Sequence, residues 1–200
     1  AGVSPRALPK GVGLVRAWLL LIAGMVYLMI LVGGATRLTD SGLSITEWQP
    51  LLGAIPPLSD ADWQEAFAKY QTMTAQFHVV NPDMGLEGFK AIYWWEWGHR
   101  QLGRVIGVAF ALPFLFFWLT GRVSRKLMPH LVVLFVLGGL QGLIGWWMVA
   151  SGVNTELTSV APYRLMTHFS LALLIIAYCF WLWLELGAER RETPVNAKGW

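Results

Sequence analysis

The hydrophobic positions of this 200-residue chain gather into four long runs, separated by polar segments of very different length. Each run is long enough to cross a hydrocarbon core of about 30 Å, which takes about 20 helical residues. Lipid offers the backbone no hydrogen-bond partner, so spanning segments of this kind form helices. The pattern predicts an all-α polytopic membrane protein, a bundle of four transmembrane helices with spans near 17–35, 94–119, 131–150 and 165–186.

A long polar segment, 36–93, separates the first two spans and carries a helical pattern of its own. Ser59 followed by Asp60 and Asp62 is typical of a helix start with acidic residues in its first turn. Aromatic residues then recur at helical spacing: Trp63, Phe67, Tyr70 and Phe77. We expect an amphipathic helix here, lying either over the mouth of the bundle or on the lipid surface.

A cleavable signal peptide is the alternative interpretation of the first run, because it ends in the small residues Gly33, Gly34 and Ala35. The uncharged stretch between Arg16 and Arg37 is longer than the roughly 7–15 residues of a signal core. We therefore interpret it as a membrane span.

Composition supports a membrane protein. Apolar residues make up 56% of the chain and charged residues only 14%, against about 25% charged residues in soluble domains. A net charge of +3 argues against a nucleic-acid-binding domain, and a single cysteine, Cys179, excludes a disulfide framework.

Basic residues set the expected orientation. They dominate the N-terminal tail 1–16, the short loop after the second span, and the tail 188–200, whereas most acidic residues fall in the other two loops. The positive-inside rule then places both termini of the membrane domain, 17–187, in the cytoplasm and the loop 36–93 outside.

Two histidines fall inside predicted spans, and each lies six residues beyond an outer helix start: His99 follows Tyr93, and His168 follows Pro162. Both helices run inward, so the two imidazoles lie at similar depth and can serve as axial ligands of one haem iron. The alternative for each is a hydrogen-bonded residue of the bundle. His78 and His130 lie outside the spans, and we interpret both as solvated.

Charged residues surround this histidine pair. Four arginines lie near its depth and are suited to the two haem propionates, although snorkelling toward the interface is the alternative: they are Arg37, Arg100, Arg104 and Arg164. Glu96, one turn before His99, is the candidate catalytic group, as a proton acceptor or a group that positions water. It can equally orient His99 or pair with Arg100.

Glycines accompany the histidines on the other spans, where they allow either a flat macrocycle to approach the backbone or close helix packing. They are Gly24, Gly33 and Gly34 in the first span and Gly138, Gly142 and Gly145 in the third.

Several motifs together resemble the haem A synthases of proteobacteria and mitochondria. They are Gly33-Gly34-Ala35-Thr36-Arg37-Leu38-Thr39, Ser41-Gly42-Leu43-Ser44, Trp48-Gln49-Pro50, Gly53-Ala54-Ile55-Pro56-Pro57, Glu96-Trp97-Gly98-His99-Arg100, Gly139-Leu140-Gln141-Gly142, Gly145-Trp146-Trp147, and Arg164 with His168. The resemblance extends over essentially the whole chain.

The resemblance implies an enzyme that oxidises the C8 methyl group of haem O to a formyl group, giving haem A for cytochrome oxidase. It implies eight helices in two similar halves, with haem O held by His99 and His168, Glu96 as the acidic residue associated with catalysis, and haem b as redox cofactor in the C-terminal half. With four spans, the chain is interpreted as the N-terminal half, and 188–200 as a tail or linker.

Haem O, membrane lipid, haem O synthase and oxidase assembly factors are the expected partners; the oligomeric state, including a homo-oligomer, stays open. Two other functions remain in competition. One is a bis-histidine cytochrome b that only transfers electrons, and the other is an assembly factor that delivers haem unchanged. Glu96 beside His99 and the long outer loop favour the enzyme.

Overall fold

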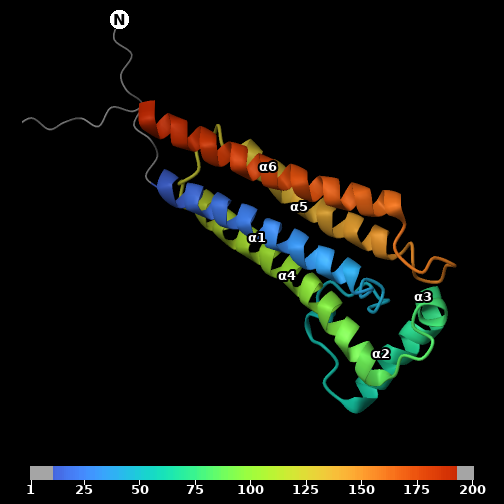
Figure 1. Ribbon diagram of the computed structural model, residues 1–200. Coiled ribbons are helices and arrows are strands. Elements are labelled where there is room, and N and C mark those ends of the chain that lie inside the picture. Colours follow the sequence, from blue (N-terminus) through green and yellow to red (C-terminus); the bar gives the residue numbers. More distant parts are fainter. Residues whose placement is uncertain (1–10, 193–200) are drawn as a thin grey trace, which may run out of the picture.

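The computed structural model describes residues 11–192, and all regular structure in that range is helical (Figure 1). Most of the predicted tails, 1–16 and 188–200, lies outside the described residues. The elements in chain order are α1 (Val12–Leu38), the 3-10 turn η1 (Leu52–Ala54), α2 (Asp60–Met73), α3 (Ala75–Val79), α4 (Leu86–Leu119), α5 (Met128–Val149) and α6 (Pro162–Glu192).

Four of these helices, α1, α4, α5 and α6, are long and apolar enough to cross a membrane. This confirms the predicted all-α integral membrane protein with four spans. The start of α1 and the end of α6 lie at the same end of the bundle, and the connection between α1 and α4 lies at the other end (Figure 1). We call that second end the loop side.

Helix α4 is longer than hydropathy indicates, because it begins at Leu86 and not near Trp94. Its first turns carry charged side chains, including the pair Glu87 and Lys90 at 2.8 Å, which a count of apolar residues leaves out. These turns extend beyond the bundle on the loop side (Figure 1). The extension gives the loop a helical surface on which to pack.

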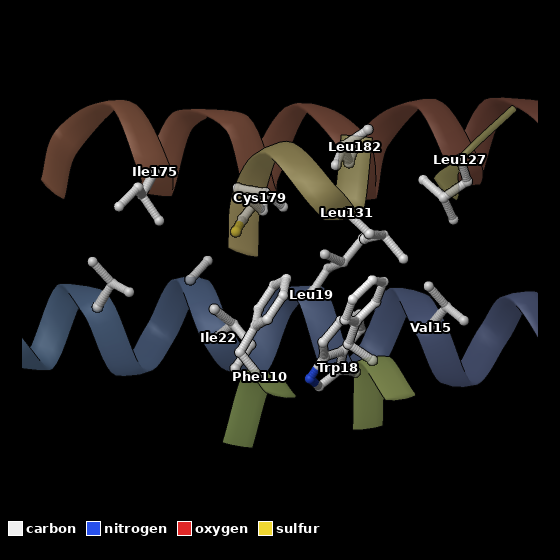
Figure 2. Close-up of a cluster of buried hydrophobic side chains, with 14 of the residues drawn as sticks. Val15, Trp18, Leu19, Ile22, Phe110, Leu127, Leu131, Ile175, Cys179 and Leu182 are labelled. Atoms are coloured by element: carbon white, nitrogen blue, oxygen red, sulfur yellow. The ribbon is translucent and has the colours of Figure 1, made fainter. Parts of the chain in front are cut away.

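Helix α1 is the centre of the bundle, packing most extensively against α6 and also against α4, while α5 packs mainly on α6. Figure 2 shows the resulting core, in which Trp18, Leu19 and Ile22 of α1 point toward the neighbouring helices. The indole Nε1 of Trp18 donates to the carbonyl of Ala109 in α4 at 2.8 Å. The indole N–H of Trp18, which lies inside the bundle, is therefore satisfied by a backbone carbonyl and also links α1 to α4.

The predicted loop helix is confirmed as α2, and its start is the expected one. Ser59 Oγ accepts from the backbone N–H of Asp62 at 3.2 Å, and the Asp62 carboxylate accepts from the N–H of Ser59 at 3.0 Å. These hydrogen bonds with Ser59 lower the pKa of Asp62. The helix ends at Met73 because Thr74 has an extended backbone and begins α3, so Phe77 belongs to α3 and not to α2.

The apolar face of α2 packs on the extension of α4. Trp63, Phe67 and Tyr70 form one buried cluster with aromatic and aliphatic side chains of α4, including Phe89 and Tyr93. Burial raises the pKa of Tyr70. The loop therefore has a small core of its own, attached to the helix that carries His99.

The bundle core gives a test of stability. Leu19 of α1 is fully buried, whereas its neighbour Leu20 is 45% exposed. We expect Leu19→Ala to lower the free energy of unfolding by about 2 kcal/mol or more, because it leaves a cavity among close-packed helices. Leu20→Ala is the matched control. Unfolding in detergent, followed by tryptophan fluorescence, measures both; equal stability of the two variants would contradict the packing described.

Candidate haem site

His99 of α4 lies against the backbone of α1. A Cβ atom on Gly33 would lie 3.0 Å from His99 Nε2, closer than ordinary van der Waals contact, and 3.5 Å from its Cδ2. Gly34, the next residue, has open space at the same position. The first glycine of the motif therefore leaves the room that the imidazole occupies.

His168 of α6 has the equivalent relation to α5. A Cβ atom on Gly145 would lie 2.9 Å from His168 Cε1, so this ring also occupies space that only glycine leaves free. The side-chain amide of Gln141 donates to the backbone carbonyl of His168 at 3.0 Å and lies 3.4 Å from its Nε2. Helix α5 thus holds both the backbone and the ring of His168.

The two imidazole rings come from different helices, α4 and α6. Each lies against a glycine of a further helix, Gly33 of α1 for His99 and Gly145 of α5 for His168. His168 Nδ1 and Gln141 Oε1 are buried and have no hydrogen-bond partner. Buried polar atoms without partners are rare in folded proteins. Two imidazoles with glycine on the adjoining helices therefore fit a haem held by axial histidines.

Glu96 lies one turn before His99 and is 2% exposed. Its Oε2 accepts from Ser44 Oγ and from the backbone N–H of Ile45, both at 2.8 Å. Its Oε1 accepts from Arg100 Nη2 at 2.5 Å. The carboxylate therefore ties the first loop to α4 and pairs with Arg100, the second of the two roles that the sequence left open.

Arg100 and Arg104 continue this attachment of the loop. Arg100 donates to the carbonyls of Ile45 at 2.6 Å and Glu47 at 3.0 Å. Arg104, one turn deeper, donates to the carbonyls of Pro50 at 2.9 Å and Gln49 at 3.0 Å. Both guanidinium groups thus have backbone partners in the loop where propionates were expected.

Arg37 and Arg164 lie near the loop-side ends of α1 and α6. Arg37 forms an exposed ion pair with Asp40 at 3.7 Å. Arg164 donates to the carbonyl of Trp147 at 2.8 Å, and its guanidinium lies 4.7 Å from the centre of the Trp147 ring. The exposed ion pair is weak, so Arg37 is the more available of the two for an anionic group.

The loop, α2 and α4 enclose a cavity of about 300 Å³ that Arg100 and Arg104 help to line. Lys69 of α2 also borders it, with Glu65 at 2.8 Å and Glu47 at 3.0 Å. Hydrogen bonds with Glu65 and Glu47 raise the pKa of Lys69. The cavity is therefore polar and lies on the loop side of the histidine pair.

The two remaining histidines differ from each other. His78 is exposed, as expected. His130 is not solvated, contrary to expectation: it lies in the first turn of α5, half-buried, with its Nδ1 2.7 Å from the hydroxyl of Tyr178. The helix begins at Met128, two residues before the histidine, which hydropathy did not indicate.

Sequence reasoning missed the loop residues that complete the site, above all Ser44 and Ile45. They are far from Glu96 in sequence, and no local periodicity joins them. The Ser41-Gly42-Leu43-Ser44 motif was the available signal, because it draws attention to a loop segment with no evident packing role.

Comparison with known proteins places the chain in a family. The sequence pattern of COX15-CtaA, described as cytochrome oxidase assembly protein, matches residues 16–199. A haem A synthase of Hyphomonas neptunium is 57% identical over 98% of this chain and 56% of its own length. Those of Azorhizobium caulinodans and Maricaulis maris are 58% and 56% identical, over 88% and 86% of this chain and 48% and 50% of theirs.

The chain spans about half the length of these curated relatives. No solved structure shows a significant match to it. The family pattern covers most of the chain, including all four membrane helices, the loop and the histidine pair. The chain belongs to the COX15-CtaA family of cytochrome oxidase assembly proteins.

Proposed function

We propose that this chain is the haem-substrate half of a haem A synthase, holding haem O while its C8 methyl group is oxidised to a formyl group. The observation that carries the proposal is the setting of the two span histidines: His99 of α4 and His168 of α6 each lie against a glycine of a neighbouring helix. Relatives named haem A synthase, at 56–58% identity, support it.

His99 and His168 hold the iron of haem O, and this ligation fixes the macrocycle relative to α4 and α6. Arg37 and Arg164 lie at the loop-side helix ends, where guanidinium groups suit two propionates. Arg100 and Arg104 can bind a propionate only if each gives up a hydrogen bond to a backbone carbonyl of the loop. Haem b, in the segment that completes the relatives, supplies one-electron chemistry for the oxidation.

Glu96 is the proposed catalytic residue, because it is the carboxylate next to a ligand in the helix. Its oxygens accept hydrogen bonds from Ser44, Ile45 and Arg100, and one of these bonds must break before the carboxylate can receive a proton or position water. This full set of partners is the observation that favours a second candidate, a bis-histidine cytochrome b in which Glu96 has only a structural role.

The topology supports the remaining parts of the proposal. Both described ends of the chain lie opposite the loop side (Figure 1), and the loop after α4 carries Arg122, Arg125 and Lys126. The positive-inside rule puts that face in the cytoplasm. We propose a bacterial inner-membrane protein that receives haem O from haem O synthase and works with oxidase assembly factors.

The first experiment identifies the haem that the chain binds. The chain is purified in detergent from cells that make haem O, and the extracted pigment is separated by chromatography and mass. We expect haem O or its hydroxylated derivative. Haem B alone would favour the electron carrier, and an absence of haem would contradict haem binding by this half.

Removal of either histidine should abolish the low-spin haem spectrum. We expect His99→Ala and His168→Ala each to weaken haem binding by at least about tenfold, because each removes an axial ligand. His78→Ala, at an exposed loop position, is the control and should bind normally. Visible spectra and haem-to-protein ratios measure the effect. Full occupancy by low-spin haem in both histidine variants would contradict the assignment of His99 and His168 as axial ligands.

The contact between His99 and Gly33 can be tested separately. Gly33→Ala should disturb haem binding, because its methyl group would lie 3.0 Å from His99 Nε2. Gly34→Ala adds the same methyl group to open space on the same helix and should leave the spectrum unchanged. The readout is the absorption spectrum of the haem complex. Identical spectra for the two variants would show that the ring does not need the first glycine.

Glu96→Gln separates chemistry from binding. The amide keeps an oxygen that accepts from Ser44 or Ile45, so we expect haem occupancy to persist while oxidation of haem O falls by about a hundredfold. Ser44→Ala removes one donor to the carboxylate and should retain most activity. Products extracted from membranes of cells making haem O are quantified by chromatography. Unchanged haem A formation with Glu96→Gln would rule out the catalytic role.

A further inference from the structure

One stretch of the loop is apolar and unpacked. Between Glu47 and Asp60 the sequence has no charged residue; we call 48–58 the proline-leucine segment. Four of its large side chains are 62% to 84% exposed: Leu51, Leu52, Ile55 and Leu58. None of them belongs to a buried hydrophobic cluster of the described residues. Water is a poor environment for such a surface.

Arg104 fixes the depth of this segment. Its guanidinium donates to the carbonyls of Gln49 and Pro50 at 3.0 and 2.9 Å. A Cβ atom on Gly53 would lie 2.9 Å from Arg104 Nη2, so the backbone of the segment approaches the side chain where only glycine fits. The segment therefore lies alongside α4, where the side chain of Arg104 reaches it.

The level of Arg104 is below the surface of the membrane. The basic residues that follow α4 keep its other end, near Leu119, at the water boundary. At about 1.5 Å per residue, the helix from Leu119 back to Arg104 is about 22 Å long. A hydrocarbon core of about 30 Å then extends about 8 Å beyond Arg104 toward the loop side.

The backbone of the segment suits such a place, where unpaired N–H groups are costly. Three of its positions, Pro50, Pro56 and Pro57, have no N–H. Other N–H groups are bonded locally: Gly53 to the Gln49 carbonyl at 3.0 Å, Ala54 to Leu51 at 3.1 Å, and Ile55 to Leu52 at 3.1 Å.

The surrounding surface of α4 is also apolar. Val108 and Leu112 follow Arg104 at helical spacing on the same face, and both are exposed. The exposed leucines of the segment therefore extend the apolar surface that Val108 and Leu112 form on α4.

We infer that the proline-leucine segment dips into the loop-side leaflet beside α4, with Leu51 and Leu52 in contact with lipid acyl chains. Arg104 anchors it there through the two backbone carbonyls. The occupant of this surface is lipid, and not a second copy of the chain or a further protein segment.

Spin labels test this depth in the whole chain, reconstituted in phosphatidylcholine and phosphatidylglycerol vesicles. Cys179 is the only cysteine and is buried, so the unlabelled parent measures its background. Leu52→Cys is compared with Val108→Cys, on the exposed apolar face of α4, and with Asp83→Cys, an exposed loop position. Accessibility to oxygen and to a water-soluble nickel complex is read from power saturation.

We expect the Leu52→Cys label to show high oxygen and low nickel accessibility, in the same ratio as Val108→Cys. Nickel accessibility like that of Asp83→Cys would overturn the inference, because the segment would then lie in water. Low accessibility to both reagents would also overturn it, since protein would then cover the surface.

A second variant tests the anchor. With the Leu52→Cys label in place, Arg104→Gln removes the guanidinium that holds Gln49 and Pro50. We expect nickel accessibility to rise several-fold as the segment leaves the leaflet. Arg37→Gln, at an exposed ion pair on another helix, is the control. An unchanged label environment in Arg104→Gln would contradict the proposed anchoring.

Discussion

The absence of water inside a bilayer is the constraint on which this structure depends. A charged or polar group at that depth must find its partner within the protein. Glu96 is buried by the protein itself, so the same requirement applies to it, and Ser44, Ile45 and Arg100 meet it. Each partner other than Arg100 belongs to the loop, so satisfying one buried carboxylate also determines where the loop lies.

The same constraint explains why α4 organises the molecule. Its loop-side turns carry the small aromatic core with α2, its middle carries His99, and Arg104 attaches the next part of the loop. Helix α1 makes most of the apolar contacts within the bundle, whereas α4 makes most of the described polar contacts between the bundle and the loop. The histidine of α4 consequently has loop attachments on both sides of it along the helix.

Much of the fold could be predicted from the sequence because hydropathy and helix length are local properties. The four spans and the start of α2 at Ser59 both follow from spacing along the chain. The contacts of Arg100 and Arg104 could not be predicted in this way. A guanidinium suits a propionate and a pair of backbone carbonyls equally well, and the carbonyls lie about fifty positions away in the sequence.

The contacts of Glu96 bear on how a catalytic role must be understood. A carboxylate with three protein donors is well fixed, and its oxygens are already engaged in hydrogen bonds. For Glu96 to take part in proton transfer as proposed, one of these interactions must loosen, and loosening the one with Ser44 or Ile45 would move the loop. On the proposed catalytic role, proton transfer and displacement of the loop from α4 would then be linked steps.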